Sequence, residues 1–171
     1  RVPKANLVHE LNKGWTVGKR LLQHERSMIG GMGGGQKTTS IEEYAQKYIG
    51  TDANGRVDDP VLRAQILRHR MNDRAFALTT RRAVEESATG NAPGAASSMF
   101  KYYGTEQNIG KYDLLLSVLG TQSLGWTGEG FDQDELDTTR AWLRSKANSI
   151  EGGTSEVQLN IIAKRVLGLP D

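Results

Sequence analysis

Apolar residues recur every three or four positions along most of this chain, which is the spacing of helices that bury one face. Two segments carry long patterns of this kind. In the first, over 61–87, the apolar positions are Leu62, Ile66, Leu67, Met71, Ala75 and Leu78. In the second, over 95–119, they are Met99, Tyr102, Ile109, Tyr112, Leu116 and Leu119. The pattern therefore predicts two long helices, each with one buried face.

Shorter patterns of the same period predict further helices over 13–31, 40–48, 136–147 and 155–167. Asp59 and Pro60 are expected to begin the first long helix, since aspartate is a good N-cap and proline a good first helical residue. Ser155 and Gln158 have the spacing of a capping box for the last helix. Residues 120–134 are rich in glycine and are expected to form a loop.

Beyond the first eight residues, no segment alternates apolar and polar residues in the manner of a strand. Several amphipathic helices joined by short loops bury their faces against one another, so the predicted fold class is all-α, an antiparallel four-helix-type bundle. The opening RVPKANLV reads as the tail of a strand and a turn. Residues 1–12 are therefore expected to end a preceding β-domain and linker, and residues 13–171 to form the bundle domain.

Composition narrows the class of protein further. The 171 residues are 37% hydrophobic and 25% charged, which is typical of one soluble globular domain. A formal net charge of +2 from 22 basic and 20 acidic residues argues against a nucleic-acid-binding surface. The chain has no cysteine, so disulfides and thiolate chemistry are excluded. We expect a cytoplasmic protein without a membrane span, and no metal site is predicted.

The last segment, NSIEGGTSEVQLNIIAKRVLGLP (148–170), places a glycine pair directly before a helix. Glycines allow backbone to come close to a ligand, and the free N–H groups of a helix N-terminus favour anionic or acceptor atoms. A simple turn followed by an N-cap explains the same residues. For an isolated segment of this kind, the simple turn is the more frequent interpretation.

The segment IEGGTSEVQLNIIAKRVLGLP resembles the C-terminal signature of the acyl-CoA dehydrogenase family, flavoenzymes that desaturate acyl-CoA thioesters between Cα and Cβ. RVPKANLVHELNKGW resembles the point where the family's middle β-domain meets its C-terminal helical bundle, and TRAWLRSKANSIEGGTSEVQ is close to a bacterial subgroup. The resemblance runs from Arg1 to Pro170. It implies that the family's N-terminal helical domain and most of its β-domain lie outside this chain, which alone is expected to be inactive.

The resemblance also implies the chemistry. The cofactor would be FAD, the substrate an acyl-CoA of fatty acid metabolism, and the reduced flavin would pass electrons to an electron-transfer acceptor. A glutamate would remove the Cα proton while the Cβ hydride passes to the flavin. Many members carry this glutamate directly before the Gly-Thr pair, where this chain has Gly152, with Glu151 one residue earlier.

Other branches of the family carry the base on the first helix of the bundle. LLQHERSMIGG matches that helix and places Glu25 at the relevant position, followed by Arg26. Because position 152 has no carboxylate and position 25 has one, we predict Glu25 as the base, with Glu151 as the alternative. Arg26 is expected to hold the helix or to meet the substrate.

The remaining family contacts follow from the same match. Thr154 and Glu156 match positions that contact the flavin, and Gly152 and Gly153 are expected beside the substrate thioester. SVLGTQSLGWTG corresponds to a loop that receives the FAD adenosine end of a partner subunit, and its best matches are Gly120 and Thr121.

The resemblance predicts a homodimer or homotetramer, with a heteromer as a further possibility. A second function remains open, in which the chain is a non-catalytic helical oligomerisation domain or a subunit of a heteromeric dehydrogenase. The carboxylate at Glu25 favours the catalytic interpretation, because a subunit retained only for assembly needs no carboxylate there.

Overall fold

The structure, a computed structural model, describes residues 1–31, 40–89 and 97–170, without the side chains of residues 23–31 and 87. It divides into two units, Arg1–Gln36 and Lys37–Asp171. In the first unit, Lys4–Asn6 form a 3-10 turn (η1) and Gly14–Gly31 form helix α1. The helix expected over 13–31 is confirmed. The only regular element of the first eight residues is this 3-10 turn, and their assignment to the end of a preceding β-domain remains a prediction.

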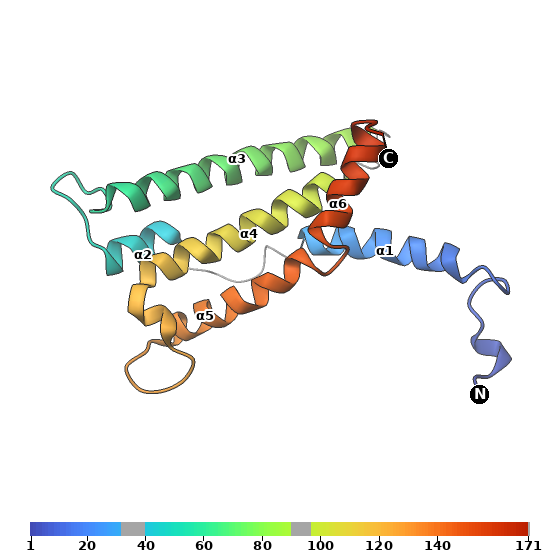
Figure 1. Ribbon diagram of the computed structural model, residues 1–171, viewed down its shortest axis with the longest axis horizontal. Coiled ribbons are helices and arrows are strands. Elements are labelled where there is room, and N and C mark those ends of the chain that lie inside the picture. The colour runs from blue at the N-terminus through green and yellow to red at the C-terminus, as the bar shows by residue number, and fades with distance from the viewer. Residues whose placement is uncertain (32–39, 90–96, 171) are drawn as a thin grey trace. The chain divides into compact units, whose positions relative to one another are not determined.

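The second unit is built from helices (Figure 1). The α-helices are α2 (Ile41–Tyr48), α3 (Pro60–Ala88), α4 (Ser97–Leu119), α5 (Gln133–Ser145) and α6 (Ser155–Ile161). Short 3-10 turns follow α4 (η4, Gly120–Leu124) and α5 (η5, Lys146–Ser149), and a π-helical turn follows α6 (η6, Ile162–Val166). Within the described residues, β-pairing is limited to an isolated bridge between Thr51 and Val57. The all-α prediction is confirmed.

Helix α4 lies at the centre of this unit and packs against α2, α3, α5 and α6. Figure 1 shows α3 and α4 running antiparallel, with α5 along the other side of α4. The buried apolar cluster forms where α2, the first turns of α3 and the last turns of α4 meet. Its members are Ile41, Tyr44, Ala45, Leu62, Ile66, Leu115, Val118 and Leu119.

Helix starts follow the capping chemistry of the sequence. The Asp59 carboxylate accepts hydrogen bonds of 2.9 Å from the backbone N–H groups of Val61 and Leu62, which confirms the predicted start of α3. Helices α2 and α5 begin with complete capping boxes, Ser40 with Glu43 and Asp132 with Glu135. The loop predicted over 120–134 is wrong in its first five residues, which form η4, and in its last two, Gln133 and Asp134, which begin α5.

The buried face of α3 differs from the predicted stripe. Leu62 and Ile66 are buried, but Leu67, Met71 and Leu78 are exposed. The prediction fails because Leu67 follows Ile66 by one position, and one helical position rotates a side chain by about 100°. The stripe from Leu67 onward therefore lies on a second face, which no described residue of this unit buries.

The face of α3 that does pack on α4 continues through Phe76. Its ring lies 6.3 Å from that of Phe100 and 5.4 Å from that of Tyr103, both on α4. One residue after Tyr103, Gly104 brings the α4 backbone under the Phe76 ring, because a Cβ at 104 would meet that ring at 3.1 Å. The close approach holds the long helices together beyond the apolar cluster.

None of the described helices is long and apolar enough to cross a membrane. The described residues also contain no group of three or more histidine, cysteine, aspartate or glutamate side chains that could hold a metal ion.

Candidate functional site

The glycine pair singled out from the sequence forms a tight turn between η5 and α6, here called the glycine turn (residues 150–154). Gly152 and Gly153 have φ angles of 67° and 95°, in the left-handed region that glycine enters without strain. Both glycines are therefore required by the backbone itself.

Thr154 caps the helix that follows. Its hydroxyl accepts a hydrogen bond of 3.3 Å from the Val157 N–H. The predicted capping box of Ser155 and Gln158 is wrong, because Thr154 is the last residue with extended backbone and so holds the cap position. The Ser155 hydroxyl instead lies 3.0 Å from the Glu106 carboxylate, to which it donates.

Gln158 holds the glycine turn from inside the protein, a role that sequence reasoning missed. Its side chain is fully buried, at 0% exposure. The amide nitrogen donates to the carbonyl oxygens of Gly152 and Gly153 at 3.0 and 3.4 Å. The available signal in the sequence was a glutamine among the apolar positions of a predicted helix.

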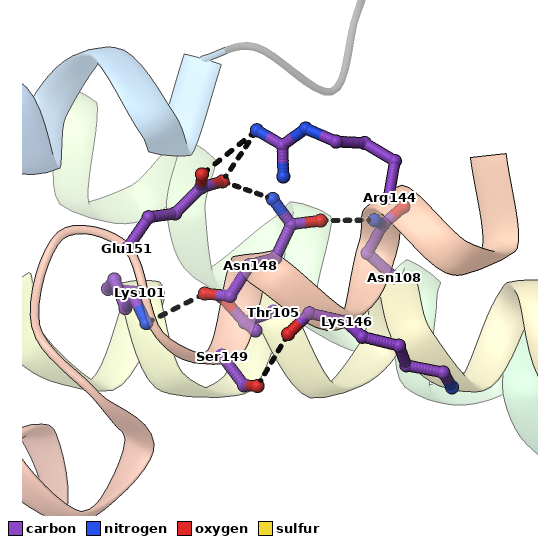
Figure 2. Close-up of polar contacts among 8 residues, drawn as sticks. All are labelled: Lys101, Thr105, Asn108, Arg144, Lys146, Asn148, Ser149 and Glu151. Carbon is purple, nitrogen blue, oxygen red and sulfur yellow. Dashed lines mark hydrogen bonds and ion pairs between the residues drawn. The ribbon is translucent and has the colours of Figure 1, made fainter. Parts of the chain in front are cut away.

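Helix α4 anchors the other side of the turn through Asn148 (Figure 2). The Asn148 carbonyl oxygen accepts from Lys101 Nζ at 2.9 Å and from the Thr105 hydroxyl at 3.4 Å. Its side-chain oxygen accepts from Asn108 Nδ2 at 3.0 Å. Lys101, Thr105 and Asn108 are four and three residues apart, so they share one face of α4.

Lys101 is a buried cation in this network, since only 4% of the residue is exposed. Burial lowers the pKa of its ammonium group, while the carboxylates of Glu151, Glu106 and Glu156 act in the opposite direction. The group forms no ion pair with any described carboxylate. Its positive charge therefore lies beside the glycine turn, among three carboxylates at longer range.

Glu151 is held within the same network. Arg144 Nη2 donates to its two carboxylate oxygens at 3.2 and 2.9 Å, and Asn148 Nδ2 donates to one of them, as Figure 2 shows. The hydrogen bonds from Arg144 are the main cause that holds the pKa of Glu151 below its ordinary value. A carboxylate stabilised in its charged form is a weaker proton acceptor.

Thr154 and Glu156, the two residues predicted to contact flavin, lie two positions apart at the start of α6. The pKa of Glu156 lies below its ordinary value, because its own backbone N–H and the Thr154 hydroxyl favour the charged carboxylate. Glu156 is exposed and Thr154 is partly buried. The start of α6 thus presents an exposed carboxylate next to the glycine turn.

The other two predicted cofactor residues lie elsewhere. Gly120 and Thr121 are exposed at the far end of α4, 15 residues beyond Thr105 and so roughly 20 Å along the helix from the glycine turn. Glu25 and Arg26 belong to α1 in the first unit, and their side chains lie outside the described residues. The structure therefore brings together residues 151–156 and separates Gly120 and Thr121 from them.

The sequence matches the family model described as "Acyl-CoA dehydrogenase, C-terminal domain" over residues 12–167. That match covers most of the chain, so the chain belongs to the acyl-CoA dehydrogenase family and corresponds to its C-terminal domain. The resemblance seen at the two ends of the sequence is confirmed. The placement of the catalytic glutamate on the first helix remains a prediction.

Named relatives agree with this assignment. The chain is 31% identical over 162 residues to acyl-CoA dehydrogenase IpdE1 of Mycobacterium tuberculosis, covering 92% of this chain and 38% of that protein. The ChsE4-ChsE5 complex from Mycobacterium tuberculosis has a TM-score of 0.71 at 28% identity, over 99% of this chain and 44% of that one. The Tcur3481-Tcur3483 steroid ACAD has a TM-score of 0.74 at 24% identity, over 99% and 43%, a likeness that shows the fold. The chain thus spans less than half of each.

Proposed function

We propose that this chain is the FAD- and acyl-CoA-contacting domain of a flavin-dependent acyl-CoA dehydrogenase that desaturates its thioester substrate between Cα and Cβ. The observation that carries the proposal is the glycine turn, whose backbone is fixed from two sides while its outer edge keeps free donors. Family membership through the C-terminal domain supports the same reaction class.

The free donors follow from peptide geometry. All peptide bonds of the described residues are trans, so each N–H points opposite to the C=O of the same peptide. Because Gln158 draws the carbonyls of Gly152 and Gly153 inward, the N–H groups of Gly153 and Thr154 point outward. No described residue accepts a hydrogen bond from either N–H. Two such donors suit the acceptor atoms of a thioester carbonyl or a flavin ring edge.

FAD, when bound, would accept the hydride from Cβ of the substrate. In this chain Thr154 and Glu156 would hold the flavin end, in keeping with their shared position at the start of α6. Gly120 and Thr121 belong to η4, beyond the far end of α4, and lie too far away to share one small contact with them. Their separation supports the expectation that they meet the adenosine end of a partner subunit's FAD.

For the Cα proton we propose Glu25 as the base, with Arg26 next to it toward the substrate. The environment of Glu151 supports this choice. Its two oxygens are occupied by Arg144 and Asn148, and its pKa is lowered, whereas a general base works best with a pKa raised toward the working pH. Glu151 is better suited to fixing the turn than to removing a proton.

We further propose that the domain associates with a second subunit through α3. The α3 stripe (Ala64, Leu67, Met71, Ala75 and Leu78) is apolar and exposed, with Leu67 at 58% and Met71 at 72%. Contiguous apolar surface on a helix face marks interaction sites. The solved relative described as a ChsE4-ChsE5 complex has two kinds of subunit, so both homomeric and heteromeric assemblies are consistent with the stripe. A role in assembly alone would not explain why the N–H groups of Gly153 and Thr154 are held pointing outward.

A flavin absorption spectrum of the complete enzyme tests the proposal. We expect bound FAD, and bleaching of its visible band when an acyl-CoA is added without oxygen. The titration should compare straight-chain acyl-CoA thioesters with thioesters of steroid side chains, because one solved relative is named a steroid ACAD. A complete enzyme that binds FAD but is not reduced by any member of either series would support the assembly role instead.

A further inference from the structure

Gln158 is an unusual residue for its position. It is fully buried, and its side-chain oxygen has no hydrogen-bond partner among the described residues. A buried amide with an unpaired acceptor opposes folding, and an apolar side chain of similar length would avoid that cost. The amide therefore needs an explanation other than packing.

The contacts of the amide nitrogen supply one. It donates to two carbonyl oxygens that belong to consecutive peptides, those of Gly152 and Gly153. It also lies 2.6 Å from the place that a Cβ of residue 153 would occupy, so a glycine is required there for the amide to reach both oxygens. Gln158 and Gly153 thus form a matched pair, in which one supplies the donor and the other leaves the space.

We propose that Gln158 is a positioning residue for the reaction, acting through the glycine turn without touching substrate or flavin. The inference rests on the proposed function. By holding both carbonyls, Gln158 fixes the planes of two peptides and so the direction of the N–H groups of Gly153 and Thr154. Donors aimed in advance at developing charge stabilise a transition state without reorganising, and freely rotating donors lose much of that effect.

Two substitutions separate the amide donor from the size of the side chain. Gln158→Met keeps the length and removes the donor. Gln158→Glu keeps the shape, but it places carboxylate oxygens against two carbonyl oxygens. We expect either variant to lower the rate of flavin reduction per bound FAD at saturating acyl-CoA by about 10- to 100-fold, as expected for a small loss of alignment. FAD content should stay close to that of the unaltered enzyme.

A control variant addresses mere loss of stability. Leu115→Val removes one methylene group from the apolar cluster at the other end of α4, where Leu115 is 1% exposed. The substitution leaves the residues of the glycine turn unchanged. It should lower the melting temperature and leave the rate of flavin reduction unchanged. Gly153→Ala provides a further variant, because its Cβ would displace the Gln158 amide from the opposite side. It should lower the rate in the same way.

The measurement combines anaerobic rapid mixing of the complete enzyme with amide hydrogen exchange over residues 150–158. We expect the Gln158 variants to exchange faster in this segment than the unaltered enzyme and to reduce flavin more slowly. Normal exchange and a normal rate in Gln158→Met would overturn the inference, as would an equal loss of rate in Leu115→Val. If the unaltered enzyme is not reduced by any acyl-CoA, the proposed function fails, while the exchange comparison still decides whether Gln158 fixes the turn.

Discussion

The Lys101 ammonium group donates to the Asn148 carbonyl oxygen at 2.9 Å, which joins α4 to the residues just before the glycine turn across 47 positions of sequence. The lysine is buried and has no carboxylate in direct contact among the described residues. Desolvation thus opposes its charge, and the folded protein gives up its proton more readily than the unfolded chain does.

That difference predicts how stability changes at alkaline pH. Because the pKa of Lys101 is lower in the folded state, the unfolded chain binds more protons between the folded pKa and the ordinary lysine value of 10.5. Across this window, the free energy of unfolding of the unaltered protein should rise relative to that of Lys101→Met. Urea denaturation of both proteins at a series of pH values measures the difference, in which other titrating groups cancel. A difference that falls with rising pH would contradict the environment described for Lys101.

Glu151 should show a pH dependence of the same sign, but in the acid range. Its pKa is lowered by Arg144, so the stability it contributes is present above the ordinary glutamate pKa and is lost as pH falls through the folded pKa. Arg144 is 62% exposed and Glu151 31%, so the contribution of the pair is small, about 1 kcal/mol or less. We expect Glu151→Gln to be slightly less stable than the unaltered protein at neutral pH and equally stable at acid pH. Melting temperatures across this range test it, and an unchanged gap at acid pH would count against the ion pair.

The glycines offer a test in which one substitution has opposite effects at two sites. Gly153→Ala must adopt a φ of 95° and push against Gln158, so it should destabilise the protein by about 1–3 kcal/mol. Gly110 lies within α4 with no atom near its missing Cβ, so Gly110→Ala should stabilise by about 0.5–1 kcal/mol. Denaturation of the two variants in parallel measures both effects. Equal destabilisation would mean that the left-handed turn is not as described.

Much of this architecture could be predicted from the sequence, because helical period and capping are local properties. Asp59 and Pro60 defined the start of α3, and the apolar spacing gave the long helices and the all-α class. The period alone could not tell which apolar face meets α4, so Leu67 and Met71 were assigned to the core although they are exposed. The spacing of apolar residues shows that a helix face is apolar, but it does not show which part of the protein covers that face.

The site was less accessible to sequence reasoning. The segment around Gly152 and Gly153 was recognised from its resemblance to a family, and the structure explains both glycines by their backbone angles. The contacts that hold the turn could not be predicted, because Lys101 and Asn148 are far apart in sequence. Gln158 was taken for part of a helix cap, since its spacing from Ser155 fits one and spacing does not show which way a side chain points.

The α3 stripe predicts the effect of charge on association. Leu67→Glu and Met71→Glu place carboxylates on a face that we propose is covered by a second subunit, so the assembly should dissociate while helicity is unchanged. Leu143→Glu, at another exposed apolar position on α5, serves as the control and should leave the assembly intact. Sedimentation velocity at micromolar concentration gives the result. If all three variants sediment as the unaltered protein does, α3 is not the interface.

The central claim is that this domain supplies the base of an acyl-CoA dehydrogenase from Glu25 and not from the glycine turn. Anaerobic rapid mixing of the complete enzyme with acyl-CoA, followed at the visible flavin band, tests it most directly. Glu25→Gln keeps the size of the side chain and removes its basicity, so flavin reduction should slow by about 10²- to 10⁴-fold. Glu151→Gln should slow it far less, because Arg144 and Asn148 already hold that carboxylate in its charged form. Reduction at the normal rate in Glu25→Gln, together with a large loss in Glu151→Gln, would contradict the assignment and place the base in the turn.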